Sequence, residues 1–426
     1  MTSAEISAGS GGRERVRRFA VLRSWKTGPY LVGGGMAMMG DNIEHVLTYW
    51  VLWERFHSPA LVGFQLVSHW LPFLLLSVYA GALAERYDCR RLIQAAQGLF
   101  IFVSIAWGVL FLTDSLQLWQ ACVLLVLHGT AGSLWGPAEQ MMLYDFAGRK
   151  QLASAVRINA TFHSLGILLG PVVGSALLVG VGPTLGIFIN VVFYLPLTIY
   201  LTRTPFTGHL REDASVGGRT STRSSTRSSL RVLLEVRHNR SIVGMLILAA
   251  LASVTIGAVL QTAMPVFGNA LAASGQDAGL IYGVLLFALG LGGVVGGFFL
   301  EASGWVKPSV GTAVVATIVF GLSAAVFAFT GSIVVAVVAL VLAGVAQITS
   351  TATEQAIVQL EAPVAQRGRV IGAYSMFGPG MQTFSGLTVG VLGTMIGIPF
   401  TVILGGCVLV AGAVATGVYI ARGRAE

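Results

Sequence analysis

The sequence predicts an all-α membrane protein with twelve transmembrane helices in two six-helix bundles. Hydrophobic residues make up 55% of the chain and charged residues only 10%, whereas soluble domains carry about 25% charged residues. Apolar stretches long enough to cross a bilayer recur along the chain. If each stretch crosses, all of the 26 Lys and Arg residues except Arg55 lie on one side. Because cytoplasmic loops carry the excess of Lys and Arg, both termini are expected to be cytoplasmic.

The predicted spans lie between charged or turn-forming breaks. In chain order they cover residues 28–52, 60–82, 92–113, 117–143, 154–181 and 184–202, and then 241–268, 277–301, 308–329, 332–356, 368–396 and 399–420. An even number of spans agrees with both termini on one side of the membrane. Two of the predicted outer turns are very short, at Gly182-Pro183 and at residues 397–399.

One long hydrophilic segment separates the first six spans from the last six. It contains a low-complexity run of Ser, Thr and Arg, which has nothing to bury and predicts a flexible linker. The expected organisation is a cytoplasmic tail (1–27), an N-terminal bundle (28–203), a cytoplasmic linker (204–240), a C-terminal bundle (241–420) and a second cytoplasmic tail (421–426).

The two halves repeat each other weakly. At a nearly constant offset, Gly81, Glu85, Arg91 and Glu139-Gln140 recur as Gly297, Glu301, Lys307 and Glu354-Gln355. Each member lies at the cytoplasmic end of a corresponding span, which favours a duplicated six-helix unit. Parallel repeats of this kind place a substrate site between the halves, near the middle of the membrane.

Ionisable residues inside apolar spans are costly, so each is a candidate functional residue. In the first span Asp41, Glu44 and His45 share one helix face, and Asp41 lies about 20 Å along the helix, too deep to reach the interface. Two carboxylates one turn apart in a low dielectric do not both ionise cheaply, and His45 can share the proton. We predict a proton-coupling site here. The alternative is an Asp41–His45 pair that only fixes packing.

Other polar residues fall on inward faces of the predicted helices and predict a substrate cavity: His69, His128, Trp135, Asn159, His163, Gln261 and Gln347. A single histidine is more often a satisfied core residue, but four at comparable depth in the N-terminal half favour a shared cavity. The C-terminal half is nearly uncharged at this depth, so we expect a mostly apolar wall containing Gln261, Phe287 and Gln347. No short-range ligand spacing indicates a metal site, and none is predicted.

The loop between the second and third spans is a candidate gate. Gly81 allows two helix ends to approach, and Glu85 can lie against the positive end of a neighbouring helix. Three basic residues, Arg86, Arg90 and Arg91, can pair with acidic groups or anionic lipid. We assign Glu139 and Glu354 to the same gate. The alternative is a basic loop that serves topology only.

The fifth span contains Gly166, Gly170 and Gly174 at every fourth position, with Pro171 among them. Such a stripe allows close packing of helices, while the proline weakens the helical ladder. Both a packing role and a gating role fit this pattern.

These motifs resemble those of the major facilitator superfamily. The loop Gly81-Ala-Leu-Ala-Glu-Arg-Tyr-Asp-Cys-Arg-Arg91 is similar to its signature G-x-L-A-D-R-x-x-R-R, and residues 166–174 are similar to the G-x-x-x-G-P-x-x-G motif of its proton-coupled antiporters. The resemblance implies the major facilitator fold over essentially the whole chain. The form Arg-Tyr-Asp-x-Arg-Arg and the segment 136–140 look most like the drug and siderophore exporter branch, which includes the enterobactin exporter.

The chain departs from the family pattern at three positions. Glu85 replaces the usual Asp of the signature loop, Leu125 stands where proton antiporters have an intramembrane Arg, and Glu139 replaces the Arg of the A-P-A-R-Q segment. The usual Arg relay for proton coupling therefore lacks its arginines at Leu125 and Glu139.

No Walker loop, nucleophile elbow or other catalytic signature occurs, which argues against an enzyme, ATP-driven transport and a cofactor. The basic residues sit in loops next to apolar spans, a pattern that does not fit nucleic-acid binding. We expect a monomeric secondary transporter of the inner (plasma) membrane, in contact with lipid, that exports an amphiphilic drug-like or siderophore-like molecule in exchange for protons. The alternatives are proton-coupled uptake, a non-transporting membrane scaffold and a lipid flippase.

Overall fold

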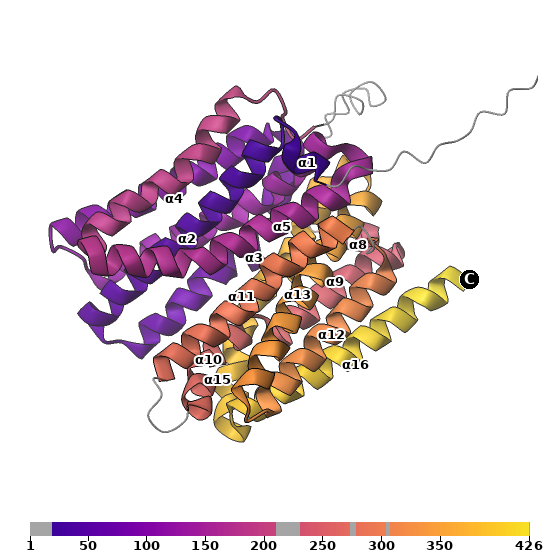
Figure 1. The fold of residues 1–426 in the computed structure, drawn as a ribbon. Coiled ribbons are helices and arrows are strands. Elements are labelled where there is room, and N and C mark those ends of the chain that lie inside the picture. Colours follow the sequence, from indigo (N-terminus) through magenta and orange to yellow (C-terminus); the bar gives the residue numbers. More distant parts are fainter. Residues whose placement is uncertain (1–18, 210–230, 273–277, 304–306, 426) are drawn as a thin grey trace, which may run out of the picture.

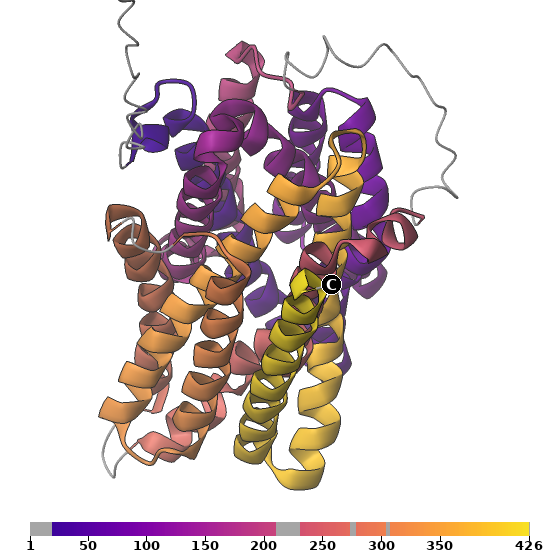
Figure 2. The same ribbon diagram turned by 90° about the vertical axis from the view of Figure 1, so that its right-hand side faces the viewer.

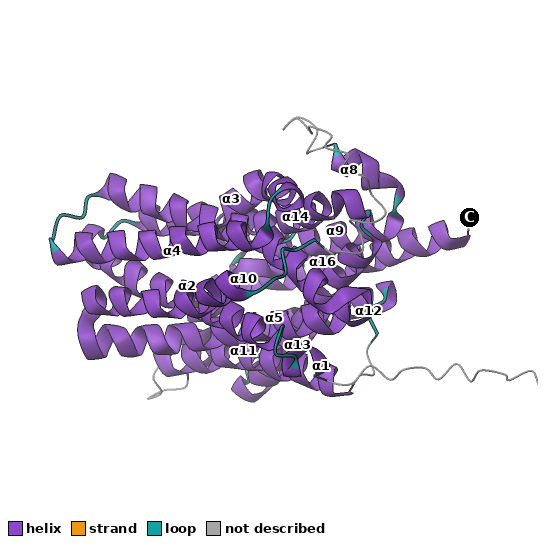
Figure 3. Ribbon diagram, turned by 90° about the horizontal axis from the view of Figure 1, so that it is seen from above, coloured by secondary structure: helices purple, strands orange, loops and turns teal. Residues whose placement is uncertain are grey.

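The computed structural model describes residues 19–209, 231–272, 278–303 and 307–425. These residues form helices joined by short loops, and no strand occurs among them (Figure 3). Two helical bundles lie side by side, the N-terminal half in indigo and magenta and the C-terminal half in orange and yellow (Figures 1 and 2).

The N-terminal half consists of α1 (Ala20–Arg23), α2 (Gly28–Phe56), α3 (Pro59–Arg86), α4 (Cys89–Leu112) and α5 (Leu118–Arg203). The long α5 comprises three segments, because Gly148 and Gly182 leave the helical conformation with φ values of 61° and 81°. Residues other than glycine rarely adopt this left-handed region, so the two glycines permit the turns. Pro183 follows the second break and starts the next segment.

The C-terminal half begins with α8 (Val232–Glu235), η1 (Val236–His238), α9 (Arg240–Ala252), η2 (Ser253–Gly257), α10 (Ala258–Leu271), α11 (Ala278–Ser303), α12 (Val310–Phe329) and α13 (Ile333–Glu361). It ends with η3 (Val364–Gln366), α14 (Arg367–Phe377), η4 (Pro379–Phe384), α15 (Ser385–Ile396) and α16 (Ile398–Ala425). A π-helical turn, η2, interrupts the first span of this half, and the 3₁₀ turn η4 interrupts the fifth. The two irregular turns pack against each other, with Gly257 next to Gln382.

Ten of the twelve predicted spans coincide with one helix or with one segment of α5, and the other two are the interrupted spans α9–η2–α10 and α14–η4–α15. Within the described residues, eight helices are long and apolar enough to cross a membrane, and the 86-residue α5 is one of them. The predicted linker contains helical structure that the sequence did not predict, because its last part forms α8 and η1. Residues 210–230 of that linker lie outside the described residues.

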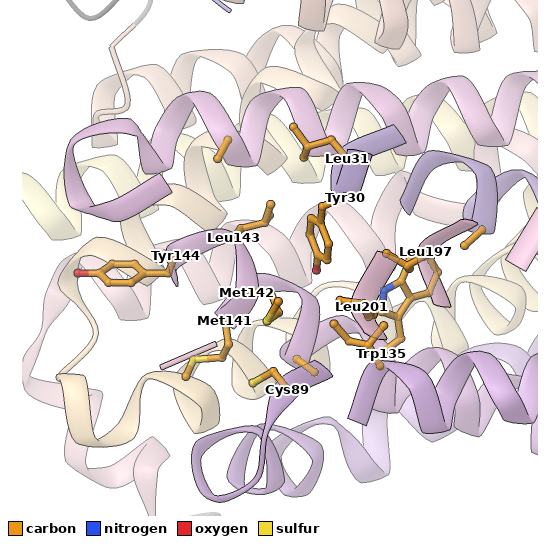
Figure 4. Close-up of a cluster of buried hydrophobic side chains, with 14 of the residues drawn as sticks. Tyr30, Leu31, Cys89, Trp135, Met141, Met142, Leu143, Tyr144, Leu197 and Leu201 are labelled. Carbon is orange, nitrogen blue, oxygen red and sulfur yellow. The ribbon is translucent and has the colours of Figure 1, made fainter. Parts of the chain in front are cut away.

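The cores of the two halves are built from buried apolar side chains. Figure 4 shows part of the N-terminal core, where Tyr30, Leu143 and Leu201 lie among the labelled side chains. Many large apolar side chains on the outside of the bundles remain exposed, including Val179 at 87% and Phe329 at 84%. A surface of this kind fits a hydrocarbon environment rather than water.

The halves touch most closely where α3 crosses α14. A methyl group added at Gly81 would lie 2.1 Å from the carbonyl oxygen of Gly368, and one at Gly372 would lie 2.2 Å from that of Ser77. Such spacing requires glycine, because any Cβ would overlap the opposite backbone. We call the end of the bundle that holds Gly81 and the Arg-rich loops the basic end.

The glycine stripe of α5 packs against α2. A methyl group at Gly166 would lie 2.6 Å from the carbonyl oxygen of Gly35, and one at Gly170 would lie 2.4 Å from Cβ of Asn42. The stripe therefore sets the distance between α5 and the helix that carries Asp41 and Glu44.

Replacing Gly170 with Leu should destabilise the protein, because the added side chain would force α5 away from α2. Overpacking of a close contact costs about 1–3 kcal/mol, so the thermal unfolding midpoint in detergent should fall. Gly180→Leu is the matched control, since this position is exposed and no atom of the described residues lies within 4 Å of a methyl group there. Equal midpoints for the two variants would contradict a tight α2–α5 contact.

Candidate functional site

A cavity of about 230 Å³ lies between the two halves. Four of its side chains are aromatic: Trp70, Phe73, Trp135 and Tyr374. The N-terminal half adds the ionisable residues Asp41, His69, Glu139 and His163, and the C-terminal half adds Gln355, Gln359 and Ser375. The N-terminal half thus supplies these ionisable residues and three of the four aromatic ones, whereas the C-terminal half supplies Tyr374 and amide and hydroxyl groups.

His128 bridges two buried carboxylates next to this cavity. Its Nε2 lies 2.7 Å from Oδ1 of Asp41, and its Nδ1 lies 2.9 Å from Oε1 of Glu44. Ser104 on α4 donates to the other oxygen of Glu44. Asp41 and Glu44 face α5 together because they are three residues apart on α2. Buried ionisable groups need partners of this kind, and the network thus joins α2, α4 and α5.

Two further histidines complete a cluster around Asp41. His45 Nδ1 lies 3.9 Å from Oδ2 of Asp41, and its ring centroid is 4.8 Å from that of His69 and 5.0 Å from that of His128. Tyr49 stacks on His45 at 5.1 Å. The structure thus brings together His69 and His128, two predicted cavity residues, with all three predicted proton-coupling residues.

A second ionisable group lies about three turns after His128 along α5. Glu139 is 3% exposed at its side chain and contacts Nε2 of His163 at 3.1 Å, while Asn159 donates to it at 3.3 Å. The ring of Trp135 lies 5.6 Å from that of His163. This arrangement places Glu139 in the cavity wall, where it bonds within its own half.

The first contact that joins the halves at the basic end is made by Glu85. One oxygen accepts the backbone N–H of Arg369 at 2.7 Å, and the other accepts its Nε at 2.9 Å. The side chains of this pair are 16% and 13% exposed, so solvent screens their attraction only in part. This contact holds α3 against α14.

The three arginines of the same loop contact their own half instead. Arg86 lies over the ring of Tyr87, and Arg91 donates to Gln94. Arg90 donates to Asp88 and to the carbonyl of Thr204. Partial burial works to raise the pKa of Asp88, but the hydrogen bonds and charge of Arg90 outweigh it and leave the pKa below its ordinary value.

A second contact joins the halves through Glu301 on α11. Ser154 donates to its Oε1 at 2.5 Å, and Nη1 of Arg157 lies 3.5 Å from its Oε2. Glu301 is the counterpart of Glu85 in the sequence repeat, and each pairs with an arginine of the opposite half. Gln359 also donates to Gln140 across the halves at 2.6 Å, and the guanidinium of Arg367 lies 3.6 Å from the ring centre of Tyr144. The basic end is therefore closed.

Several predicted residues lie elsewhere. Gln347 is exposed and Phe287 is 51% exposed, and neither lines the cavity. Gln261 belongs to α10, but its side chain is outside the described part of the structure. Glu354 accepts hydrogen bonds from Ser350 at 2.6 Å and Tyr374 at 3.1 Å, within its own half. It therefore positions Tyr374, which lines the cavity.

Sequence reasoning missed the partners that complete the site. Arg369 and Arg157 were visible only as basic residues near the first residues of predicted spans, and Ser104 carried no signal in an apolar span. The sequence did indicate Glu301, because the repeat relates this residue to Glu85. The C-terminal wall lies about two turns further along α13 than predicted, at Gln355 and Gln359.

The sequence pattern of the Major Facilitator Superfamily matches residues 30–386. The chain belongs to this superfamily. Members of this superfamily are multi-pass membrane transporters rather than enzymes, and this chain has the apolar helices of that class. It is 25% identical over 188 residues to the staphyloferrin A transporter of Staphylococcus aureus, covering 42% of this chain and 46% of that protein. It is also 24% identical over 179 residues to the uncharacterised MFS-type transporter YfiS of Bacillus subtilis, covering 39% and 42%. The matches thus span less than half of each relative.

Solved structures of the superfamily share the fold. The transporter FucP in its outward conformation superposes with a TM-score of 0.72 at 13% identity, covering 91% of this chain and 98% of that one. The human organic anion transporter MFSD10 gives 0.71 at 12% identity, with coverage of 91% and 99%. At these identities the likeness concerns the fold alone.

Removing the charge of Glu85 and Glu301 should favour opening of the basic end in this transporter. The double variant Glu85→Gln, Glu301→Gln loses both ion pairs, so the closed population should fall on the order of tenfold relative to the open one, about 1.4 kcal/mol. Distances between spin labels at exposed positions 149 and 361, in a cysteine-free background, would report this shift.

Asp114→Asn is the control, because it removes the exposed Arg55–Asp114 ion pair at the other end of the same half. Its distance distribution should match that of the wild type. An unchanged distribution in the double variant would favour a purely topological role for the basic loop.

Proposed function

We propose that this transporter exports an amphiphilic small molecule by alternating access, in exchange for protons. The proposal rests on Asp41, whose side chain both bonds His128 and lines the cavity between the halves. Cargo in the cavity and a proton on the Asp41–His128–Glu44 network therefore compete for the same carboxylate. Competition of this kind couples the transport of cargo to the transport of protons, because each ligand lowers the affinity of the protein for the other.

The distribution of charge supports an orientation with both termini in the cytoplasm of a cell bounded by an inner (plasma) membrane. The basic end would face the cytoplasm under the positive-inside rule. In this orientation the contacts of Glu85 and Glu301 close the cytoplasmic side, and the cavity loads or releases on the outer side. One chain supplies both walls of the cavity, so a monomer is sufficient for transport.

The lining of the cavity supports an amphiphilic cargo. Trp70, Phe73 and Trp135 offer flat apolar surface, while Gln355, Gln359 and Tyr374 offer hydrogen-bonding groups on the opposite wall. Ligand sites of this composition take molecules with an apolar body and a few polar groups. One partial relative is a staphyloferrin A transporter, which supports a siderophore-like cargo within this class.

Replacing Asp41 with Asn and Glu44 with Gln should abolish pH-driven transport, because the amides cannot carry the proton. Cargo exchange without a pH gradient should persist. Both kinds of transport are measured in proteoliposomes loaded with fluorescent amphiphilic dyes or metal-free siderophores. Imposing the pH gradient in each direction also separates export from uptake. Glu54→Gln, at an exposed position of the same helix, is the control. Wild-type pH-driven flux in the double variant would remove Asp41 and Glu44 from the coupling mechanism.

Replacing Trp135 with Ala should weaken binding of the transported dye about tenfold, because it removes a large apolar face from the cavity. Gln347→Ala should leave affinity unchanged, since this residue does not line the cavity. Calorimetry or fluorescence anisotropy on purified protein measures both. Trp53→Ala, at an exposed position near the end of α2, controls for loss of tryptophan. An effect of Gln347→Ala as large as that of Trp135→Ala would show that the cargo binds elsewhere.

A further inference from the structure

Four side chains of types that bind metal ions converge next to the cavity. Asp41 and His45 come from α2, His69 from α3 and His128 from α5. Each offers one ligand atom, and these four atoms all lie within 4.8 Å of one another. Only Asp41 and His45 are close in sequence, four residues apart, and the other two residues lie far along the chain, so the sequence shows no complete ligand set.

The four ligands match a particular class of ion. Three imidazoles and one carboxylate suit divalent ions such as Zn²⁺, Co²⁺ and Ni²⁺, whereas Mg²⁺ and Ca²⁺ prefer oxygen ligands. Tetrahedral bonds of about 2.0–2.1 Å place ligand atoms about 3.4 Å apart. Oδ1 of Asp41 lies 2.7 Å from Nε2 of His128, and Oδ2 of Asp41 lies 3.9 Å from Nδ1 of His45. These two separations lie on either side of that value.

The surroundings also orient the ligands. Glu44 contacts Nδ1 of His128, and Ser104 in turn donates to Glu44. A carboxylate behind the far nitrogen fixes the tautomer, so that Nε2 presents its lone pair to an ion, as in many metal sites. His45 Nε2 and His69 Nδ1 are buried and have no hydrogen-bond partner among the described residues. Buried polar atoms are usually satisfied, so the His69 ring is suited to another ligand. In His45 the atom that lies near Asp41 is the other nitrogen, Nδ1.

We propose that Asp41, His45, His69 and His128 form a binding site for a divalent transition-metal ion, with Glu44 as the residue that positions His128. The ion reaches the site from the cavity, because Asp41 and His69 line it. Ion binding requires the lone pairs on which protons would otherwise sit, so binding releases protons. A bound ion therefore inhibits proton-driven export, and this consequence rests on the proposed function. Ion binding itself does not depend on the proposed function.

The test uses the full chain, purified in detergent without a polyhistidine tag and stripped of metal. Titration with Zn²⁺ should show one ion bound per chain by calorimetry, and Co²⁺ should give the visible absorption of a four-coordinate site. His69→Gln and His128→Gln should each weaken Zn²⁺ binding at least about tenfold, and Glu44→Gln about 10–100-fold. His45→Gln provides a further ligand variant if one of these fails to fold.

The controls separate this site from other histidines. His57→Asn removes an exposed histidine at a left-handed position that Asn tolerates, and His163→Gln removes one bound to Glu139 in the same cavity. Both should bind Zn²⁺ as the wild type does. The proposal is overturned if the wild type binds no Zn²⁺, if a folded His69→Gln, His128→Gln double variant binds it unchanged, or if Mg²⁺ displaces it at equal concentration. Because no gradient is present, this result is independent of the transport assays.

Discussion

The pairing of His128 with Asp41 and Glu44 is the interaction on which the N-terminal half depends. A carboxylate inside a membrane bundle is tolerated only with a partner, and here one imidazole serves two carboxylates. The requirement ties α2 to α5 and, through Ser104, to α4. The α5 glycine stripe packs on α2 from the second segment of α5, whereas His128 belongs to the first segment. Charge pairing and close helix packing therefore join α2 to two different segments of α5.

The two halves contribute different residues to the cavity but similar contacts at the basic end. The N-terminal half carries the ionisable groups, whereas the C-terminal half contributes Gln355, Gln359 and Tyr374 to the cavity. At the basic end the halves are nearly equivalent, since Glu85 and Glu301 each reach an arginine across the interface. The repeat has thus kept its symmetry where the halves meet and lost it where the cavity lies.

How far the sequence determines these features differs between them. Hydropathy and the glycine breaks predict the helices, because span length and backbone freedom are local properties. Helical periodicity also predicts that Asp41, Glu44 and His45 share a face. Periodicity does not give the level at which one helix meets another, so Gln347 was predicted in a wall that Gln355 and Gln359 occupy. The cross-helix partners, Ser104 and Arg369 among them, depend on tilt and contact between helices that are far apart in sequence.

The irregular turns η2 and η4 interrupt two spans of the C-terminal half, whereas α2 is continuous. Helices resist bending because each turn is held by its ladder of hydrogen bonds, and sharp kinks occur where the ladder is already interrupted. Two interrupted helices that touch at Gly257 and Gln382 form a joint. When the two halves move relative to each other, bending would concentrate at η2 and η4, while the continuous α2 would move as a rigid helix. Asp41 and His128 would then keep their spacing as the opposite wall changes shape.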